Sequence, residues 1–140
     1  MTNQAMEIFS RDAYSAHLGI ELIESADGNS LVKMPIQPFH LNGGGRVHGG
    51  ALLSLADFAL AAAAISRGDY GSAVSVQMNF MKGAGEGTLW ARGEELSQGR
   101  SIRHYRVTVE DDAQTLIGSF QGTVYLMQDP SKLLNQKKPG

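Results

Sequence analysis

The feature of this sequence that most restricts its fold is an apolar run that carries one carboxylate. Residues 51–65 read ALLSLADFALAAAAI, in which the polar side chains are Ser54 and Asp57. We expect a helix from about Val47 to Arg67 that is buried on most sides, because it is apolar nearly all round. A charge held away from water costs free energy unless it is paired or used. Asp57 is therefore either a functional carboxylate or a structural one bonded to backbone donors or to Arg67.

Size and composition restrict the class of protein further. With 140 residues, of which 42% are hydrophobic and 19% charged, the chain suits one globular domain with a real core. Residues 128–140 are polar, and we interpret them as a loose tail. The sequence has no cysteine, which excludes disulfides, a zinc–thiolate site and a cysteine nucleophile.

The charge balance and the first residues indicate where such a protein works. A formal net charge of -2 without a long basic run argues against a nucleic-acid-binding surface. The run 51–65 is shorter than the roughly 20 apolar residues that cross a bilayer. The start, MTNQAMEIFSRDAY, lacks the basic segment followed by an apolar one that marks a signal peptide. We therefore expect a cytoplasmic protein that binds neither nucleic acid nor a membrane.

The rest of the sequence predicts one more helix and a set of strands. Apolar residues recur at roughly helical spacing over residues 4–16, and Gly19 follows as a stop. Residues 19–36 read as two strands around Asp27-Gly28-Asn29, a strong hairpin signal. Further alternating strands are expected at residues 74–81, 88–96, 101–110 and 115–127.

These elements predict an α+β fold. The simplest packing wraps an antiparallel sheet of about five or six strands, connected as a meander, around one long central helix. Such a sheet has edge strands, whose unpaired backbone groups invite pairing with a second copy of the chain. We therefore expect a homodimer.

Gly49 and Gly50 stand where the long helix begins. The first N–H groups of a helix lack partners within it and carry partial positive charge, which suits an oxyanion formed when a carbonyl is attacked. Tight packing of the helix on the sheet is the alternative reason for these glycines. Asp57 follows Gly50 by seven residues, about 10 Å along the same helix. The helix start and Asp57 of one chain are therefore too far apart to contact the same reacting atom. The spacing favours a site shared by two chains with antiparallel helices.

Three further polar residues are candidates for the same site as Gly50 and Asp57. Asn42 could hold a substrate carbonyl or a water, although a turn role is more common for asparagine. His48 could donate to a carbonyl or cap the helix start. Ser75 lacks the G-x-S-x-G turn of a serine nucleophile, so its hydroxyl would place a water or orient Asp57. The histidines show no metal-ligand spacing, and we predict no metal site.

The order H-x-N-x-x-G-x-x-H-G-G over residues 40–50, followed by L-x-D on an apolar helix, resembles the hotdog-fold acyl-CoA thioesterases. The likeness is greatest to the phenylacetate-degradation (PaaI-type) branch of the 4-hydroxybenzoyl-CoA thioesterase-like family. It spans roughly residues 15–127, which would form the core of a single hotdog domain. The resemblance implies hydrolysis of an acyl-CoA, aromatic in that branch (phenylacetyl or hydroxyphenylacetyl). It also implies no cofactor, since coenzyme A is part of the substrate, and homodimers that pair into homotetramers.

The resemblance assigns roles to matching positions. Asp57 matches the catalytic carboxylate, which acts as a nucleophile or as a general base on water. The N–H of Gly50, with Gly49 beside it, matches the donor that polarises the thioester carbonyl across the dimer interface. The positions that match residues assisting the substrate, the water or the carboxylate are Asn42, His48 and Ser75.

Two questions stay open at the level of the sequence. Lys82, Arg100 and Arg103 could meet the phosphates of coenzyme A, or they could be solvated surface residues. A hydratase or dehydratase using His48 with Asp57, and an acyl-CoA-binding protein without catalysis, are the alternatives to hydrolysis. Release of free thiol separates hydrolysis from both.

Overall fold

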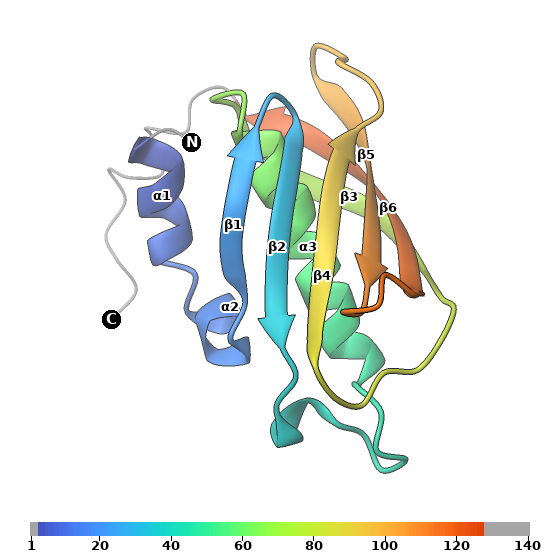
Figure 1. The fold of residues 1–140 in the computed structure, drawn as a ribbon. Coiled ribbons are helices and arrows are strands. Elements are labelled where there is room, and N and C mark those ends of the chain that lie inside the picture. Colours follow the sequence, from blue (N-terminus) through green and yellow to red (C-terminus); the bar gives the residue numbers. More distant parts are fainter. Residues whose placement is uncertain (1–2, 128–140) are drawn as a thin grey trace.

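The computed structural model describes residues 3–127, so the polar tail predicted at 128–140 lies outside the described residues (Figure 1). Three helices, a short 3₁₀ turn and six strands follow one another along the chain. In chain order they are α1 (Asn3–Ser10), α2 (Ala13–Leu18), β1 (Glu21–Ala26), β2 (Asn29–Pro35), η1 (Pro38–His40), α3 (Gly49–Ile65), β3 (Tyr70–Phe80), β4 (Thr88–Glu95), β5 (Ile102–Glu110) and β6 (Leu116–Met127).

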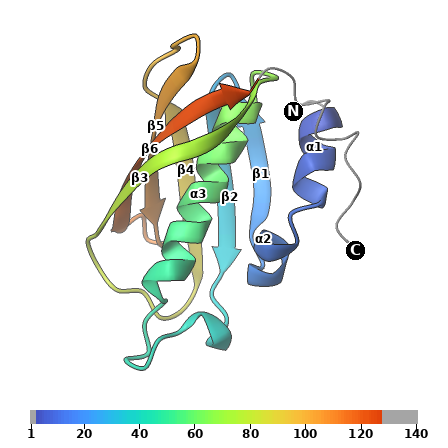
Figure 2. The same cartoon turned by 180° about the vertical axis from the view of Figure 1, so that it is seen from behind.

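The six strands form one antiparallel sheet whose concave side holds α3 (Figures 1 and 2). The predicted α+β fold, with a sheet around one central helix, is confirmed. The predicted meander is wrong in one place, because the strand order is β1-β2-β4-β5-β6-β3. Helix α3 crosses the concave side after β2 and delivers the chain to the far edge, so β3 pairs with β6. The edges are therefore β1 and β3.

The alanine-rich side of α3 packs closely on the sheet because the facing strand residues are small. A Cβ added at Gly93 of β4 would lie 2.8 Å from the Ala59 carbonyl oxygen. Ser30 Oγ donates to that same oxygen at 2.6 Å, and Ser25 Oγ donates to the Ala62 oxygen at 2.7 Å. Both serines are buried, so these bonds satisfy polar groups in the core and hold the helix against β1 and β2.

The helix ends differ slightly from the prediction. Helix α3 begins at Gly49 with His48 as its N-cap and ends at Ile65, rather than running from Val47 to Arg67. The predicted helix over residues 4–16 is two helices, because the Asp12 side chain accepts from the Ser15 N–H at 3.0 Å and starts a new helix there.

Two turns are as predicted. Gly19 ends α2 in the left-handed conformation at φ +80. Asp27 and Gly28 take φ 54 and 83, as a two-residue hairpin turn between β1 and β2 requires.

Helix α3 is buried on most sides, as predicted, and one stripe of it is open. Gly50 and Asp57 are exposed, and Leu53, Ser54 and Ala61 between and after them are half-buried. The neighbouring β3 carries exposed apolar side chains as well, with Val74 62% and Val76 42% accessible. Leu53, Ser54 and Asp57 of this stripe line one cavity together with residues 73–76 of β3.

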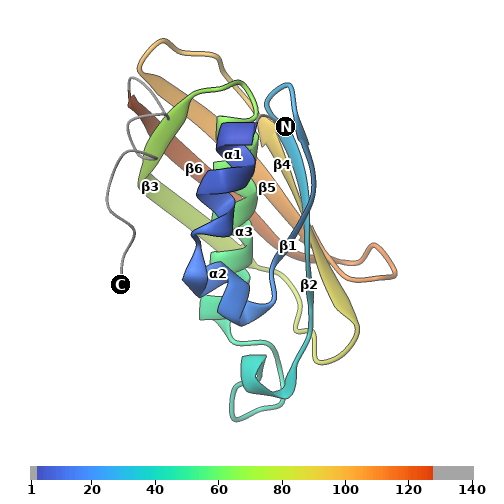
Figure 3. The ribbon, with the colours of Figure 1, turned by 90° about the vertical axis from the view of Figure 1, so that its left-hand side faces the viewer.

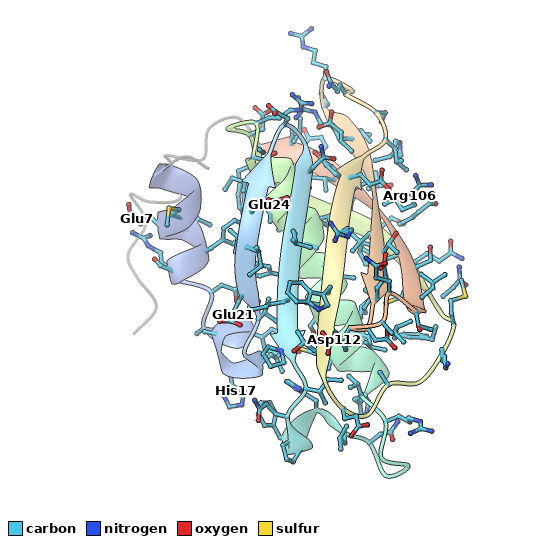
Figure 4. All side chains as sticks on the ribbon, in the orientation of Figure 1. Glu7, His17, Glu21, Glu24, Arg106 and Asp112 are labelled. Carbon is cyan, nitrogen blue, oxygen red and sulfur yellow. The ribbon has the colours of Figure 1, made fainter. Side chains whose placement is uncertain are left out.

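The opposite face of the sheet is charged. Figure 4 shows Glu21, Arg106 and Asp112 on the face turned away from α3. Trp90 Nε1 donates to Asp112 at 3.0 Å on this face. This bond and the one from the Thr88 N–H lower the pKa of Asp112. Within residues 3–127, no helix is long and apolar enough to span a bilayer.

Candidate active site

Asp57 stands between two cavities on the open side of α3. The smaller cavity, of about 370 Å³, lies towards the end of α3 and also reaches Phe9, Asp12 and Tyr70. The larger cavity, of about 440 Å³, lies towards the start of α3 and is lined by Leu53, Ser54, Asp57 and residues 73–76 of β3. Asp57 therefore borders both of these cavities.

The Asp57 carboxylate is not used to hold the fold together. Within residues 3–127, no hydrogen bond or ion pair joins its side chain to another residue. Arg67, the structural partner considered above, instead bonds Glu95 Oε2 at 2.9 Å and the Asp27 carbonyl oxygen at 3.0 Å. Although Asp57 is exposed, the cavity walls remove part of its hydration, and this desolvation raises its pKa. The negative charge of Asp12 raises that pKa further.

The start of α3 is capped by His48. Its Nδ1 accepts the Gly50 N–H at 3.2 Å, so that nitrogen carries no proton and the neutral ring has its proton on Nε2. Of the two roles open for His48, capping is the one present in the single chain, and the exposed Nε2–H remains a donor for a ligand.

The two glycines differ in what surrounds them. A Cβ at Gly49 would lie 3.3 Å from the Phe80 ring, a tight contact that this exposed ring would relieve by a small shift. At Gly50 the nearest atom to an added Cβ is His48 Nδ1, at an ordinary 3.5 Å. Packing within the chain therefore does not require glycine at position 50, which leaves its open space for a ligand or a partner.

The loop before α3 is held by two residues of the histidine–asparagine motif. Asn42 Oδ1 accepts from the Gly44 N–H at 2.9 Å and from the Arg46 N–H at 3.2 Å. His40 is buried, with Nε2 2.8 Å from the Leu18 oxygen and Nδ1 accepting from the Gln37 N–H. The carbonyl of His40 accepts the His48 N–H at 2.7 Å. His40 and Asn42 thus fix the position of the helix start, and the amide nitrogen of Asn42 can still donate to a ligand.

The structure does not bring all predicted site residues together within one chain. Neither cavity at Asp57 is lined by Asn42, His48, Gly49 or Gly50. Ser75 lines the larger cavity with Asp57, but it also lines a separate cavity with Gln77 and His104, and its register partner on β6 is Thr123. A single chain therefore carries a carboxylate half and a helix-start half that are separate.

The three basic residues considered for coenzyme A lie at different ends of the molecule. Lys82 is exposed in the connection after β3, whose Ala84 oxygen accepts the Val47 N–H at 2.7 Å next to the helix start. Arg103 is bound to Asp69 at 2.9 Å beyond the end of α3, and Arg100 is exposed in the connection between β4 and β5.

Sequence reasoning missed Arg46, which is exposed beside Lys82 and packs its stem over Gly83. Its position directly before the Val-His-Gly-Gly sequence was the available signal.

Sequence reasoning also missed the contribution of the N-terminal helices. Phe9 packs on Phe58 with ring centroids 4.9 Å apart, and Tyr14 Oη lies 2.9 Å from Ser54 Oγ. Figure 3 shows α1 and α2 over α3. The amphipathic pattern of residues 4–16 indicates a packed helix but not which surface it packs on.

The described residues contain no metal-binding group. Between residues 3 and 127, no three His, Asp or Glu side chains lie together as a metal ion would require.

One long helix wrapped by a six-stranded antiparallel sheet, with a carboxylate on the open helix face and glycines at its start, defines a hotdog-fold thioester hydrolase. The family model of the thioesterase superfamily matches residues 44–117, which include the helix start, all of α3 and β3–β5. The chain belongs to the thioesterase superfamily.

Individual relatives agree with this assignment. The acyl-coenzyme A thioesterase PaaI of Escherichia coli is 32% identical over 84% of this chain and 85% of its own length. The structure of the E. coli PaaI protein superposes with a TM-score of 0.86 at 29% identity, covering 90% of this chain and 92% of that one. A hypothetical thioesterase of Streptococcus pneumoniae, solved with coenzyme A, gives a TM-score of 0.83 at 26% identity over 89% and 98% of the two chains.

Proposed function

We propose that this thioester hydrolase cleaves acyl-CoA to a free acid and coenzyme A. The observation that carries the proposal is Asp57, an exposed carboxylate without a partner among residues 3–127, with a raised pKa, between two cavities. A carboxylate that stabilised the fold would be bonded. The acyl-CoA class is supported by the E. coli relative that is named an acyl-coenzyme A thioesterase and by the S. pneumoniae relative solved with coenzyme A.

The reaction adds water across the thioester carbonyl and breaks the carbon–sulfur bond. Asp57 acts either as a general base that takes a proton from the attacking water, or as a nucleophile whose mixed anhydride water then hydrolyses. The Gly50 N–H, with Gly49 beside it, stabilises the oxyanion by sharing or releasing its 3.2 Å bond to His48 Nδ1, and the sulfur leaves as a thiolate that takes up a proton. Asn42, His48 and Ser75 hold the substrate carbonyl or the water. Neither route needs a metal or a redox cofactor.

The complete site is shared by two subunits in this proposal. The helix start and Asp57 are separate within one chain, and the edge strand β3 lies beside the open stripe of α3. A second copy that pairs along β3 would cover Val74 and Val76 and bring its own helix start to this Asp57. Pairing of such dimers into a homotetramer follows from the family likeness.

Substituting Val76 with Glu should break this dimer. The side chain is an apolar, 42% exposed residue of the β3 edge, and covering an unpaired charge costs at least about 3 kcal/mol, or roughly a hundredfold in the dissociation constant. Sedimentation velocity at a series of concentrations measures the change. The matched control is Gln77→Glu, the next residue on the opposite face of β3, which should leave the oligomer intact. A dimer that is equally strong in both variants would contradict the β3 interface.

Substituting Gly50 with Ala should lower thiol release by about ten- to a hundredfold, because the methyl group occupies the space through which the carbonyl oxygen approaches. The protein should fold normally, since an added Cβ meets only His48 Nδ1, at 3.5 Å. Gly43→Ala is the control, because an added Cβ there meets nothing within 4 Å. Equal rates in the two variants would remove Gly50 from the proposed oxyanion site.

Thiol release from a panel of acyl-CoAs tests the function itself. We propose aromatic substrates such as phenylacetyl- or hydroxyphenylacetyl-CoA, because of the likeness to PaaI, and short and medium acyl chains complete the panel. Binding without thiol release would favour a non-catalytic acyl-CoA-binding protein. Consumption of a 2-enoyl-CoA without thiol release would favour a hydratase. Lys82, Arg100 and Arg103 stay candidates for the phosphate contacts, and a cytoplasmic location stays a prediction.

A further inference from the structure

We infer that Asp12, on the N-terminal helices, is a positioning residue that sets the pH range of the reaction through its charge on Asp57. The inference rests on the proposed function of Asp57 and adds to it. Asp12 and Asp57 line the same cavity of about 370 Å³ although 45 residues separate them in the sequence.

Two contacts hold the N-terminal helices against α3. Tyr14 Oη lies 2.9 Å from Ser54 Oγ, one turn before Asp57, and the Phe9 ring packs on Phe58 directly after it. Asp12 lies between these two anchors in sequence and faces the cavity where Asp57 stands. The segment thus runs antiparallel to α3 and forms a wall of the site (Figure 3).

The Asp12 carboxylate is oriented by neutral donors. Its Oδ1 accepts from the Ser15 N–H at 3.0 Å and its Oδ2 accepts from the Ser15 hydroxyl at 2.8 Å. These bonds fix the carboxylate but do not neutralise it. A rigid negative charge therefore faces the cavity.

The lining of this cavity holds no cation that could cancel that charge. Its titratable lining consists of Asp12 and Asp57 with Tyr70 of β3, and α3 adds no cation to the lining. The adjacent Arg11 bonds Glu7 Oε1 at 3.2 Å, one turn earlier on the N-terminal segment. The interaction of Asp12 with Asp57 is therefore a repulsion between two carboxylates across a partly desolvated space.

The sign of the effect follows from this repulsion. A neighbouring negative charge disfavours the ionised form of Asp57, so desolvation and Asp12 together raise the Asp57 pKa above that of an ordinary aspartate. The reaction needs the ionised form of Asp57. As the pH falls, turnover is therefore lost at a higher pH than it would be with an aspartate of ordinary pKa. A higher pKa also makes the carboxylate a stronger base at neutral pH.

The variant Asp12→Asn tests the inference, because Asn caps a helix as well as Asp does but carries no charge. We expect the acid limb of the pH profile of kcat/KM to move to lower pH. Added salt should move the limb to lower pH in the unaltered protein by screening the repulsion, and this salt effect should shrink in Asp12→Asn. The control Ser15→Ala removes the hydroxyl bound to Asp12 Oδ2 but keeps the backbone N–H that holds Oδ1, so the charge stays in place. It should lower Tm while leaving the limb in place.

A direct titration of Asp57 by carboxyl-carbon NMR separates this inference from the function on which it rests. A lower Asp57 pKa in Asp12→Asn, together with a shifted limb, supports both. An unchanged Asp57 pKa and an unchanged limb overturn the role of Asp12, while activity that depends on Asp57 leaves the proposed function standing. A limb that shifts as much in Ser15→Ala shows a structural effect and also overturns it. Asp12→Ser, another good helix cap, serves if Asp12→Asn does not fold.

Discussion

Asp57→Asn should lower the rate of thiol release from acyl-CoA by about two to four orders of magnitude. The amide has the size of the carboxylate, but it neither takes a proton from water nor attacks a carbonyl. Substrate binding should change little, because Asp57 borders the cavities without making up their apolar walls. The loss should therefore appear in kcat more than in KM.

The same substitution should leave stability unchanged or raise it at neutral pH. The folded-state pKa of Asp57 is raised by desolvation and by Asp12, so the folded state disfavours the ionised form. The group thus adds stability when protonated, below its unfolded pKa, and loses that contribution as the pH rises through the folded pKa. Asp57→Asn removes the unfavourable charge at neutral pH, and its advantage in Tm should vanish under acid conditions. Thermal unfolding at neutral and acid pH measures this.

Asp27→Asn is the matched control. It makes the same chemical change at an exposed hairpin position with φ 54, a conformation that asparagine adopts readily. Among residues 3–127, the carboxylate of Asp27 makes no hydrogen bond. Its rate should equal that of the unaltered protein. If Asp57→Asn kept a near-normal rate as well, Asp57 would not be the reacting group.

The parts of the fold that could be predicted are those that depend on neighbours in the sequence. The run 51–65 is apolar all round and forms α3, and Asp27-Gly28 has the residues that a two-residue hairpin turn needs. The split of residues 4–16 into two helices also depends on neighbours in the sequence, because the Asp12 side chain accepts the Ser15 N–H and caps α2. The apolar residues nevertheless recur at helical spacing through this break, so their pattern does not reveal it. Short-range rules thus recover most of the elements.

The parts that could not be predicted depend on contacts between distant segments. β3 lies next to β6 because α3 carries the chain across the sheet, and no local pattern reports that crossing. The same holds for Asp12, whose effect on Asp57 exists only because Phe9 and Tyr14 place the N-terminal helices on one face of α3. The carboxylate and the glycine turn of the proposed site stand out in the sequence, whereas the cavity walls around Asp57 do not.

A mixed dimer should recover the activity that two separate variants lose. Asp57→Asn lacks the carboxylate, and Gly50→Pro lacks the N–H proposed to bind the oxyanion. Proline is tolerated in the first turn of a helix, and the one hydrogen bond that Gly50→Pro removes among the described residues is the capping bond to His48 Nδ1. Each variant alone should be nearly inactive, because both sites of its dimer carry the same defect.

The two subunit types compensate only if the site is shared. In a dimer of one Asp57→Asn chain and one Gly50→Pro chain, one site combines the intact carboxylate of the second chain with the intact helix start of the first. The other site carries both defects. Mixed dimers isolated through two different affinity tags should therefore show about half the kcat of the unaltered dimer, with a normal KM.

Recovery of activity in the mixed dimer requires that each site combines residues of both subunits. A site built within one chain would give mixed dimers no more active than the parent variants, because every chain would still carry one defect. The separation of the Asp57 cavities from Gly50 in the single chain favours recovery.

A mixed dimer of one Asp57→Asn chain and one Gly43→Ala chain is the reference for full recovery, because the Gly43→Ala chain has an intact helix start and an intact Asp57. That dimer should also show about half the kcat, since one of its two sites lacks the carboxylate. Equal recovery in the two mixed dimers would place the Asp57 of one subunit opposite the helix start of the other.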